Sequence, residues 1–184
     1  VLGFCNMLLK LLEEKKSDKV VVIFDTARKT FRNDIFNEYK ANRGDPPEDL
    51  IPQFGIIREA VDAFNITRVE LAGYEADDLI ATYANFFDNK NWNVEIISSD
   101  KDLMQLVNKN ITMRDPIKNK NIGEEEVFSK FGVFPQKVID VQSLAGDNVD
   151  NIPGAPGIGI KTAAALVNEF GSLENILKNY KKIK

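Results

Sequence analysis

The sequence of 184 residues has no histidine, one cysteine and no long apolar run. Without histidine, the chain lacks the commonest general base and the usual zinc ligand. Any catalysis must therefore use carboxylates, lysines or water activated by a metal. The single cysteine, Cys5, cannot form an internal disulfide, which fits a reducing cytoplasm. No run reaches membrane-spanning length and no signal-peptide pattern is present, so we expect no membrane partner.

Acidic residues outnumber basic ones, and the formal net charge of −4 by itself disfavours nucleic acid as a partner. Eight of the 28 acidic residues, however, gather in the clusters described below. If cations neutralise those eight, 24 basic residues face 20 acidic ones, a balance of about +4. For any one basic residue, a solvated surface charge is an equally good explanation. The basic residues gather at Arg28, Lys29 and Arg32, at Lys40 and Arg43, and at Lys178, Lys181, Lys182 and Lys184.

Hydrophobic residues make up 43% of the chain, enough to bury one core, and their spacing predicts an α/β fold. Strands alternate with helices over residues 1–115, which indicates a central, mostly parallel sheet flanked by helices. Residues 116–184 are expected to form a helical C-terminal portion. The segment Thr26–Pro47 has few core-facing apolar residues, so we expect it to be mobile. The expected strands are Val20–Phe24, Arg68–Ala72, Val94–Ile97 and Ile111–Arg114, with a turn between short strands at Asn119–Asn121; the expected helices are Val1–Lys16, one from Pro46–Pro47 to about Phe64, Glu75–Phe87, Glu124–Phe131, Pro135–Leu144, an alanine-rich helix after the GAPGIGIKT stretch and a final helix capped by Ser172.

Acidic residues follow or begin predicted elements at four places. Three of them open the Glu75–Phe87 helix, where acids also complement the helix dipole. Asp102 matches a capping box with Ser99, whereas Asp100 has no evident local role. Asp25 alone fits a turn, and the GDNVDN stretch fits an Asx-rich loop. Because the carboxyl ends of parallel strands share one edge of a sheet, we expect the carboxylates to converge there. The candidate metal ligands are Asp25, Glu75, Asp77, Asp78, Asp100, Asp102, Asp147 and Asp150.

Crowded carboxylates repel one another unless a proton or a cation neutralises them, and hard divalent cations such as Mg2+ take oxygen ligands. Two such ions, about 3.5–4 Å apart, can activate a water and stabilise the leaving oxygen in phosphodiester hydrolysis. The charge that develops on a phosphoryl group also calls for basic side chains, for which Arg32, Lys40 and Arg43 are candidates. The acidic pattern therefore predicts a metal centre for phosphate chemistry.

The stretch Gly154–Thr162, GAPGIGIKT, is similar to a P-loop but departs from it. One residue separates Gly159 from Lys161, and no strand precedes the stretch. A hairpin between two helices fits better, with backbone N–H groups at the helix start able to approach a phosphate. A plain helix-start turn explains the same residues equally well. A clamp of this kind would contact the backbone of a nucleic acid without reading its sequence.

Six motifs, FDTARKTFR, YKANR, GYEADD, SSDKDL, GDNVDNIPG and GIGIKTA, occur together and in this order. The set resembles the 5′-nuclease domain at the amino end of bacterial DNA polymerase I, in the flap endonuclease family, over essentially the whole chain. The resemblance implies a PIN-like nuclease core with a helical arch at about residues 26–47 and a helix–three-turn–helix clamp at about residues 143–170. It also implies 5′–3′ exonuclease and 5′-flap endonuclease activity on DNA and RNA primers, in replication and repair at the bacterial nucleoid.

The same resemblance implies roles for the candidate residues. Two Mg2+ ions are expected, replaceable by Mn2+, with a potassium ion at the clamp. The implied partner is flapped, nicked or primer-bearing duplex DNA, bound by a monomer, with a polymerase domain in the full-length chain. The first metal is expected at Asp25, Glu75, Asp77 and Asp78, and the second at Asp100, Asp102 and Asp150, with Asp147 as a ligand or beside one; the scissile phosphate is expected at Arg32, Lys40 and Arg43, and further DNA contacts at Arg28, Lys29, Tyr39, Gly157, Gly159, Lys161 and Thr162.

The sequence departs from the family pattern at its two ends. The family opens with a strand that bears an aspartate in a D-G-x-x motif, which precedes the position of Val1, and it continues beyond the clamp. We therefore expect a fragment, truncated at both ends, and the corresponding hypothesis is that it carries most of the site with its activity weakened or lost. One alternative is a catalytically silent DNA-binding module, which would bind flapped duplex without cleaving it. A PIN-type ribonuclease would prefer single-stranded RNA, although the clamp disfavours it. A free-standing nuclease outside any polymerase fits the sequence as well.

Overall fold

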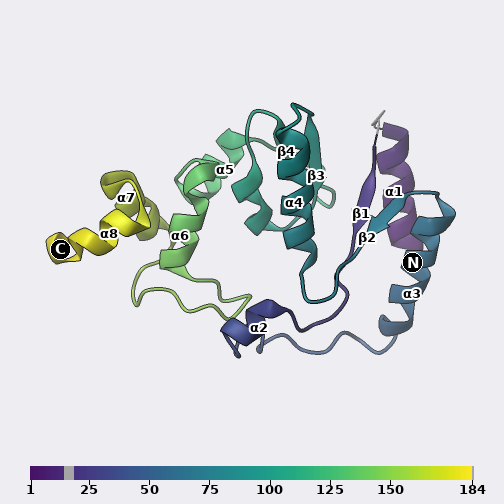
Figure 1. Cartoon of the computed structure of the whole chain (residues 1–184), viewed down its shortest axis with the longest axis horizontal. Coiled ribbons are helices and arrows are strands. Elements are labelled where there is room, and N and C mark those ends of the chain that lie inside the picture. Colours follow the sequence, from purple (N-terminus) through teal and green to yellow (C-terminus); the bar gives the residue numbers. More distant parts are fainter. Residues whose placement is uncertain (15–18, 184) are drawn as a thin grey trace. The chain divides into compact units, whose positions relative to one another are not determined.

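The computed structural model describes residues 1–14 and 19–183 (Figure 1). The expected helix end at Lys16 and the basic residue Lys184 lie outside these described residues. The chain divides into two compact units. Unit 1 consists of Val1–Ile35 and Gly44–Ile80, and unit 2 consists of Phe36–Arg43 and Ala81–Lys184.

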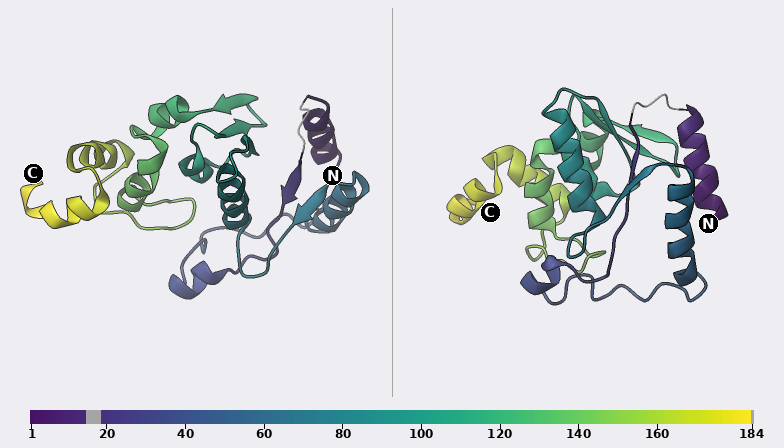
Figure 2. Two further views of the ribbon diagram at one scale, coloured as in Figure 1. Left: turned by 45° about the horizontal axis from the view of Figure 1, so that its top comes forward. Right: turned by 45° about the vertical axis from the view of Figure 1, so that its right-hand side comes forward.

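Unit 1 is built on two short parallel strands, β1 (Val21–Ile23) and β2 (Thr67–Val69). The β-branched residues of both strands suit a half-buried pleated surface. Helix α3 (Ile51–Ala63) packs against β2 and against helix α1 (Leu2–Glu14), and α1 and α3 lie side by side in Figure 2. Val61 of α3 is fully buried, so this helix supplies part of the core of the unit. Unit 1 also contains the short helix α2 (Phe31–Ile35) and the start of helix α4 (Ala76–Asp88).

Unit 2 contains a three-stranded sheet in the order β3 (Val94–Ile97), β4 (Ile111–Asp115), β5 (Lys120–Ile122). Strands β3 and β4 pair in parallel, and β4 pairs with β5 in antiparallel orientation. In β4, buried residues alternate with more exposed ones, as expected for a strand with one face in the core. The 3₁₀ helix η1 (Lys101–Leu106) follows β3 and so begins at the carboxyl end of a parallel strand, where ligands commonly bind.

The other regular elements of unit 2 are helices, and α6 (Val138–Ala145) packs against α7 (Ile160–Phe170). The loop that joins them brings Gly146 and Gly154 together. A Cβ atom on Gly154 would lie 2.3 Å from the carbonyl oxygen of Ala145, so only glycine fits there. This close approach holds the loop that carries the GDNVDN motif. The remaining elements are α5 (Glu124–Phe131), the 3₁₀ helix η2 (Pro135–Lys137), α8 (Leu173–Asn179) and the 3₁₀ helix η3 (Tyr180–Lys182).

Several predicted elements have the bounds expected from the sequence. The strand Val94–Ile97 and the helix Glu124–Phe131 coincide with β3 and α5. Ser172 caps α8, because its Oγ accepts a hydrogen bond from the backbone N–H of Asn175 at 3.3 Å. Within the described part of the chain, no helix has both the length and the apolar character needed to cross a membrane.

The start of α3 corrects a prediction. The helix expected from Pro46–Pro47 begins instead at Ile51. Pro52 lies in its first turn, where a residue without an N–H group and with φ fixed near the helical value is favoured. A proline does lie in the first helical turn as expected, but it is Pro52 and not Pro46 or Pro47.

Two further boundaries differ from the prediction. The turn expected at Asn119–Asn121 lies earlier, because β5 begins at Lys120. Asp115 makes this turn, since its Oδ1 accepts hydrogen bonds from the N–H groups of Ile117 and Lys118 at 2.9 and 3.0 Å. The stretch Pro135–Leu144 is not one helix, because η2 occupies its first turn before α6 begins.

Candidate metal and nucleic-acid site

The acidic residues of unit 1 surround the first turn of α4. The Oδ1 atom of Asp25 accepts a hydrogen bond from the N–H of Ala76 at 2.7 Å, and Oδ2 of Asp78 accepts one from the N–H of Glu75 at 3.0 Å. Both carboxylates thus satisfy N–H groups that a helix start leaves unpaired. Glu75 is buried, and Asp77 lies half-buried in the same turn. The predicted ligands of the first metal are therefore neighbours along one helix start.

Arg32 pairs with one of these carboxylates. Its Nη1 and Nη2 atoms each donate to an oxygen of Asp78 at 2.7 Å, a bidentate ion pair. Its guanidinium lies 4.7 Å from the ring centroid of Phe31, whose ring lies 5.6 Å from that of Tyr74. The N–H of Phe31 also donates to the carbonyl of Gly73 at 3.0 Å. These contacts hold α2 against the chain segment that enters α4.

Arg58 also belongs to this region, although no sequence motif indicates it. Its Nη2 donates to the carbonyl oxygen of Asp25 at 2.7 Å, and its Nε donates to Glu70 at 2.9 Å. Arg58 therefore fixes the backbone that presents the Asp25 carboxylate. Arg28, predicted to contact DNA, pairs with Asp45 and donates to the carbonyl of Gly44 at 3.1 Å, and the neighbouring Lys29 is exposed.

Asp100 has a local structural role that we did not expect. It is the N-cap of η1, and its Oδ1 accepts a hydrogen bond from the N–H of Asp102 at 2.9 Å. The predicted capping box between Ser99 and Asp102 is not the cap that forms. Ser98 instead supports the turn, since its Oγ accepts from the N–H of Asp100 at 3.0 Å.

Lys101 and Gln142 engage the next two carboxylates of unit 2. The Nζ of Lys101 lies 2.7 Å from Oδ2 of Asp147, and Nε2 of Gln142 donates to Oδ1 of Asp102 at 2.5 Å. Sequence reasoning missed both partners. Lys101 could have been found, because it stands between two candidate ligands, but Gln142 lies 40 residues from Asp102 and carries no signal.

The electrostatics of these groups reflects their crowding. Burial raises the pKa of Asp102, and the nearby carboxylates of Asp100 and Asp147 raise it further, while the hydrogen bond from Gln142 opposes the shift. Burial would also raise the pKa of Asp147. The hydrogen bond and charge of Lys101 and the N–H of Val149 outweigh that effect and hold this pKa below its usual value. The three carboxylates therefore share one environment in which negative charge needs compensation.

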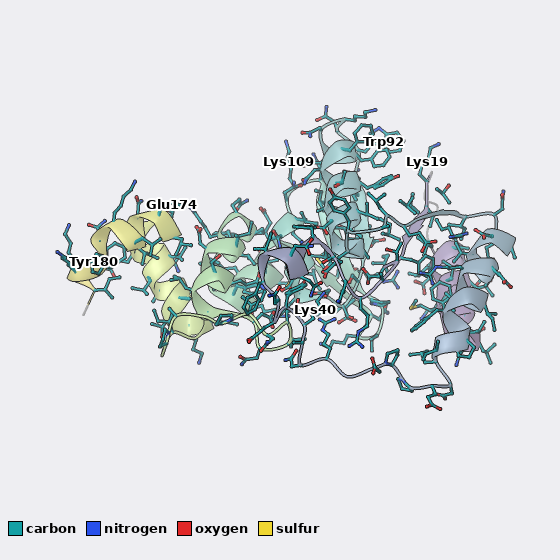
Figure 3. All side chains as sticks on the ribbon, turned by 60° about the horizontal axis from the view of Figure 1, so that its bottom comes forward. Lys19, Lys40, Trp92, Lys109, Glu174 and Tyr180 are labelled. Carbon is teal, nitrogen blue, oxygen red and sulfur yellow. The ribbon has the colours of Figure 1, made fainter. Side chains whose placement is uncertain are left out.

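Asp150 is buried and surrounded by residues from the segment Phe36–Arg43, which belongs to the same unit. The hydroxyl of Tyr39 donates to its Oδ2 at 3.3 Å, Arg43 pairs with its Oδ1, and Nζ of Lys40 lies 3.9 Å from Oδ2. The backbone N–H of Lys40, labelled in Figure 3, donates to the carbonyl of Asp150 at 2.9 Å. Three residues predicted near the scissile phosphate or the DNA thus meet one predicted metal ligand.

The predicted clamp residues lie at the start of α7. Gly157 has a φ of +77°, and no atom lies within 4 Å of a Cβ built on it. Gly159 is the N-cap of α7, with open space at its Cβ position, and Lys161 and Thr162 are exposed in the first turn. The glycines therefore leave the backbone at this helix start accessible, which is what contact with a phosphate requires.

The donor set fits a hard divalent cation, because it consists of carboxylate oxygens alone. Among residues 1–14 and 19–183, no group of three or more acidic or cysteine side chains is close enough together to hold a metal ion in this arrangement. Basic side chains instead compensate the carboxylates within each unit: Arg32 at Asp78, Lys101 at Asp147, and Lys40 and Arg43 at Asp150.

The sequence matches the models of two protein families. The first is described as 5′-3′ exonuclease, N-terminal resolvase-like domain, and it matches residues 1–132. The second is described as 5′-3′ exonuclease, C-terminal SAM fold, and it matches residues 133–184. DNA polymerase I of Rhizobium leguminosarum is 53% identical over 191 residues, covering the whole chain and 19% of the polymerase. The 5′-3′ exonuclease of Aquifex aeolicus is 43% identical over 182 residues, covering 99% of this chain and 63% of that protein. The chain thus spans about a fifth of the first relative and less than two thirds of the second.

Two solved structures share the fold of this chain. The T5 D15 protein co-crystallised with metal ions superposes with a TM-score of 0.84 at 22% identity, covering 96% of this chain and 71% of that protein. The catalytic core of Rad2 in complex with DNA substrate superposes with a TM-score of 0.66 at 22% identity, covering 99% of this chain and 58% of that protein. The predicted fold class, a mostly parallel sheet flanked by helices with a helical C-terminal portion, is confirmed, and so is the predicted family resemblance.

Proposed function

Since the chain belongs to the 5′-3′ exonuclease family, we propose that it hydrolyses phosphodiester bonds at the 5′ ends and 5′ flaps of duplex DNA, RNA primers included. The observation that carries this proposal is the meeting of Tyr39, Lys40 and Arg43 with Asp150 in unit 2. A hydrolase for phosphodiesters needs cations for the phosphate beside carboxylates for a metal, and this group contains both.

Two divalent cations, Mg2+ or Mn2+ in its place, are part of the proposal. Bound at the carboxylates, they would supply charge compensation and activation of the attacking water. Asp25, Glu75, Asp77 and Asp78 would hold one of them, and Asp100, Asp102, Asp147 and Asp150 would hold the other. Support comes from the all-oxygen donor set and from the T5 D15 protein, which was co-crystallised with metal ions.

The chain's own side chains would position the substrate. Arg32, Lys40 and Arg43 would hold the scissile phosphate from an arch at about residues 26–47. A clamp at about residues 143–170 would hold the duplex, with a potassium ion at the accessible backbone near Gly157. Rad2, which shares the fold, was solved with a DNA substrate, and this supports duplex DNA as the partner.

We further propose that a monomer acts in the bacterial cytoplasm at the nucleoid and, as in the polymerase relatives, beside a polymerase domain. Further DNA contacts are proposed at Arg28, Lys29, Tyr39, Gly159, Lys161 and Thr162.

Cleavage of a labelled 5′-flap duplex tests the proposal. Product is expected in Mg2+ and none in EDTA, and Asp100→Asn should lower the rate by at least about a hundredfold, or about 2.7 kcal/mol in the barrier. Asparagine retains the side-chain oxygen that caps η1, so this variant removes charge while leaving the local fold intact. The rate and products would be followed by gel electrophoresis.

Asp140→Asn is the matched control, because Asp140 lies on α6 in the same unit and pairs only weakly with Lys137, 3.7 Å away. It should cleave as fast as the parent chain. Tight flap binding without cleavage in either Mg2+ or Mn2+ would contradict the proposal and favour a DNA-binding module.

A further inference from the structure

The segment Glu38–Arg43 and the loop Asn148–Asn151 are joined by contacts that no site motif describes. We call these contacts the arch–loop junction. Besides the side chains around Asp150, two asparagine amides cross it in opposite directions. Nδ2 of Asn42 donates to the carbonyl of Asn148 at 2.8 Å, and Nδ2 of Asn151 donates to the carbonyl of Glu38 at 2.8 Å. Between them, the N–H of Lys40 donates to the carbonyl of Asp150.

The backbone at the junction is held in an uncommon conformation on both sides. Lys40 has a φ of +55°, a region that residues other than glycine seldom adopt, and Asn151 has a φ of +58°, which asparagine tolerates better than most residues. Such conformations persist only where surrounding contacts determine them. Here the surrounding contacts include the three junction hydrogen bonds, which join residues more than 100 positions apart in the sequence.

The junction connects two parts of the proposed chemistry. On one side are Lys40 and Arg43, which are proposed to hold phosphate, and on the other are Asp147 and Asp150, which are proposed to hold a metal. Asn151 follows Asp150 directly, and Asn42 precedes Arg43 directly. Each asparagine therefore fixes the backbone from which a functional side chain projects. Hydrogen bonds of this kind, one step removed from a ligand, set its orientation.

We propose that Asn42 and Asn151 are positioning residues, which hold Lys40 and Arg43 of the arch segment against the loop that carries Asp147 and Asp150. The order of residues 38–43 and the binding of a divalent cation at this loop are therefore coupled. This inference rests on the proposed function, and it assigns the two asparagines a role that their sequence motifs do not indicate. It also means that residues 38–43 are ordered by the loop even if the rest of the segment 26–47 is mobile.

The test compares the parent chain with Asn42→Ala, Asn151→Gly and the double variant. Glycine at 151 keeps the left-handed backbone conformation, so Asn151→Gly removes the amide without adding strain. Amide hydrogen exchange of residues 38–43 and Mn2+ affinity by titration would both be measured on the free protein. The double variant should exchange these amides at least about tenfold faster and bind Mn2+ at least about tenfold more weakly, the range found for residues that orient metal ligands.

Asn168→Ala is the matched control, since Nδ2 of Asn168 also donates to a backbone carbonyl, that of Gly132 at 2.9 Å, in the same unit. It should change neither quantity, and thermal unfolding should show all variants folded. Unchanged exchange at residues 38–43, or Mn2+ affinity within about twofold of the parent for the double variant, would overturn the inference. Neither measurement uses DNA, so failure of flap cleavage would not be confused with failure of the junction.

Discussion

The carboxylate of Asp115 is buried, with 5% of the residue exposed, and it is well supplied with hydrogen bonds. The N–H group of Lys118 is the main reason that the pKa of Asp115 lies below its usual value of 3.8; burial opposes the shift, and the N–H of Ile117 adds to it. A carboxyl group whose pKa is lowered by folding stabilises the fold above its unfolded pKa. That contribution disappears as the pH falls through the lower folded value.

Asp115→Asn should therefore reduce the pH dependence of stability. Asparagine keeps an oxygen that can accept the two N–H bonds but cannot ionise, so the variant should be less stable than the parent at pH 7. The gap should narrow as the pH falls from about 5 through the unfolded pKa of Asp115 and on through its lower folded pKa, where the parent carboxylate becomes protonated. Thermal midpoints measured across this range would check the prediction. Substitution of the exposed residue Asp49, Asp49→Asn, serves as a control. A stability difference between Asp115→Asn and the parent that stays constant at every pH would contradict the prediction.

The site residues divide according to whether their partners are local or distant. Asp147 could be found from its sequence pattern, and its Oδ1 does make the expected Asx turn with the N–H of Val149 at 2.8 Å. Gln142, Arg58 and Asn42 could not, because each acts on a carboxylate or carbonyl that only the fold brings near. Sequence spacing therefore identifies candidate ligands but not the residues that orient them.

At the scale of elements, the two glycines at the start of α7 differ in their backbone conformation. Gly157 has a φ of +77°, which disfavours any side chain, whereas Gly159 has a φ of −93° and open space at its Cβ position. The first glycine is explained by backbone conformation alone. The second has no such explanation, so we attribute it to the approach of a phosphate to the helix start.

Alanine substitutions should therefore affect different properties at these two positions: stability at Gly157 and duplex binding at Gly159. Gly157→Ala should lower the free energy of unfolding by about 1–2 kcal/mol, because it forces a Cβ into the left-handed region. Gly159→Ala should leave stability within about 0.5 kcal/mol of the parent. It should nevertheless weaken duplex binding about tenfold, or about 1.4 kcal/mol, because a methyl group would keep the phosphate away.

Urea unfolding and fluorescence anisotropy with a labelled duplex would measure these two effects. Gly55→Ala on α3, where nothing lies within 4 Å of an added Cβ, is the control for binding. Equal duplex affinity for the parent and Gly159→Ala would mean that Gly159 belongs to a plain helix-start turn.

Most elements could be predicted from periodicity, and the failures have local physical causes. β3 and α5 were found because apolar spacing and clear end signals coincide. The start of α3 was missed because three nearby prolines compete, and only Pro52 lies in the first turn. The cap of η1 was missed because Asp100 and Ser99 are both good caps, and the sequence alone does not say at which of them the helix begins.

At the scale of the whole molecule, charge sets the condition for binding DNA. The chain carries 28 acidic and 24 basic residues, so without a cation it should repel a polyanion. Eight of those acids are the proposed metal ligands, and several of the basic residues proposed to hold phosphate are paired with them in this structure. The fold class could be predicted from alternating strands and helices, but this pairing could not, because it joins residues more than 40 positions apart in the sequence.

Duplex affinity should therefore depend on divalent cations even where no cleavage occurs. A labelled flap duplex should bind at least about tenfold more tightly in Ca2+ than in EDTA, because a hard divalent cation takes oxygen ligands and neutralises the acidic groups. Anisotropy titrations at several KCl concentrations would measure this difference. Lys161→Ala should weaken binding in both conditions and lower the salt slope by about 0.9, the loss of one phosphate contact. Equal affinity in Ca2+ and EDTA would mean that the carboxylates do not control DNA binding, because their charge would then be compensated by the chain's own lysines and arginines alone.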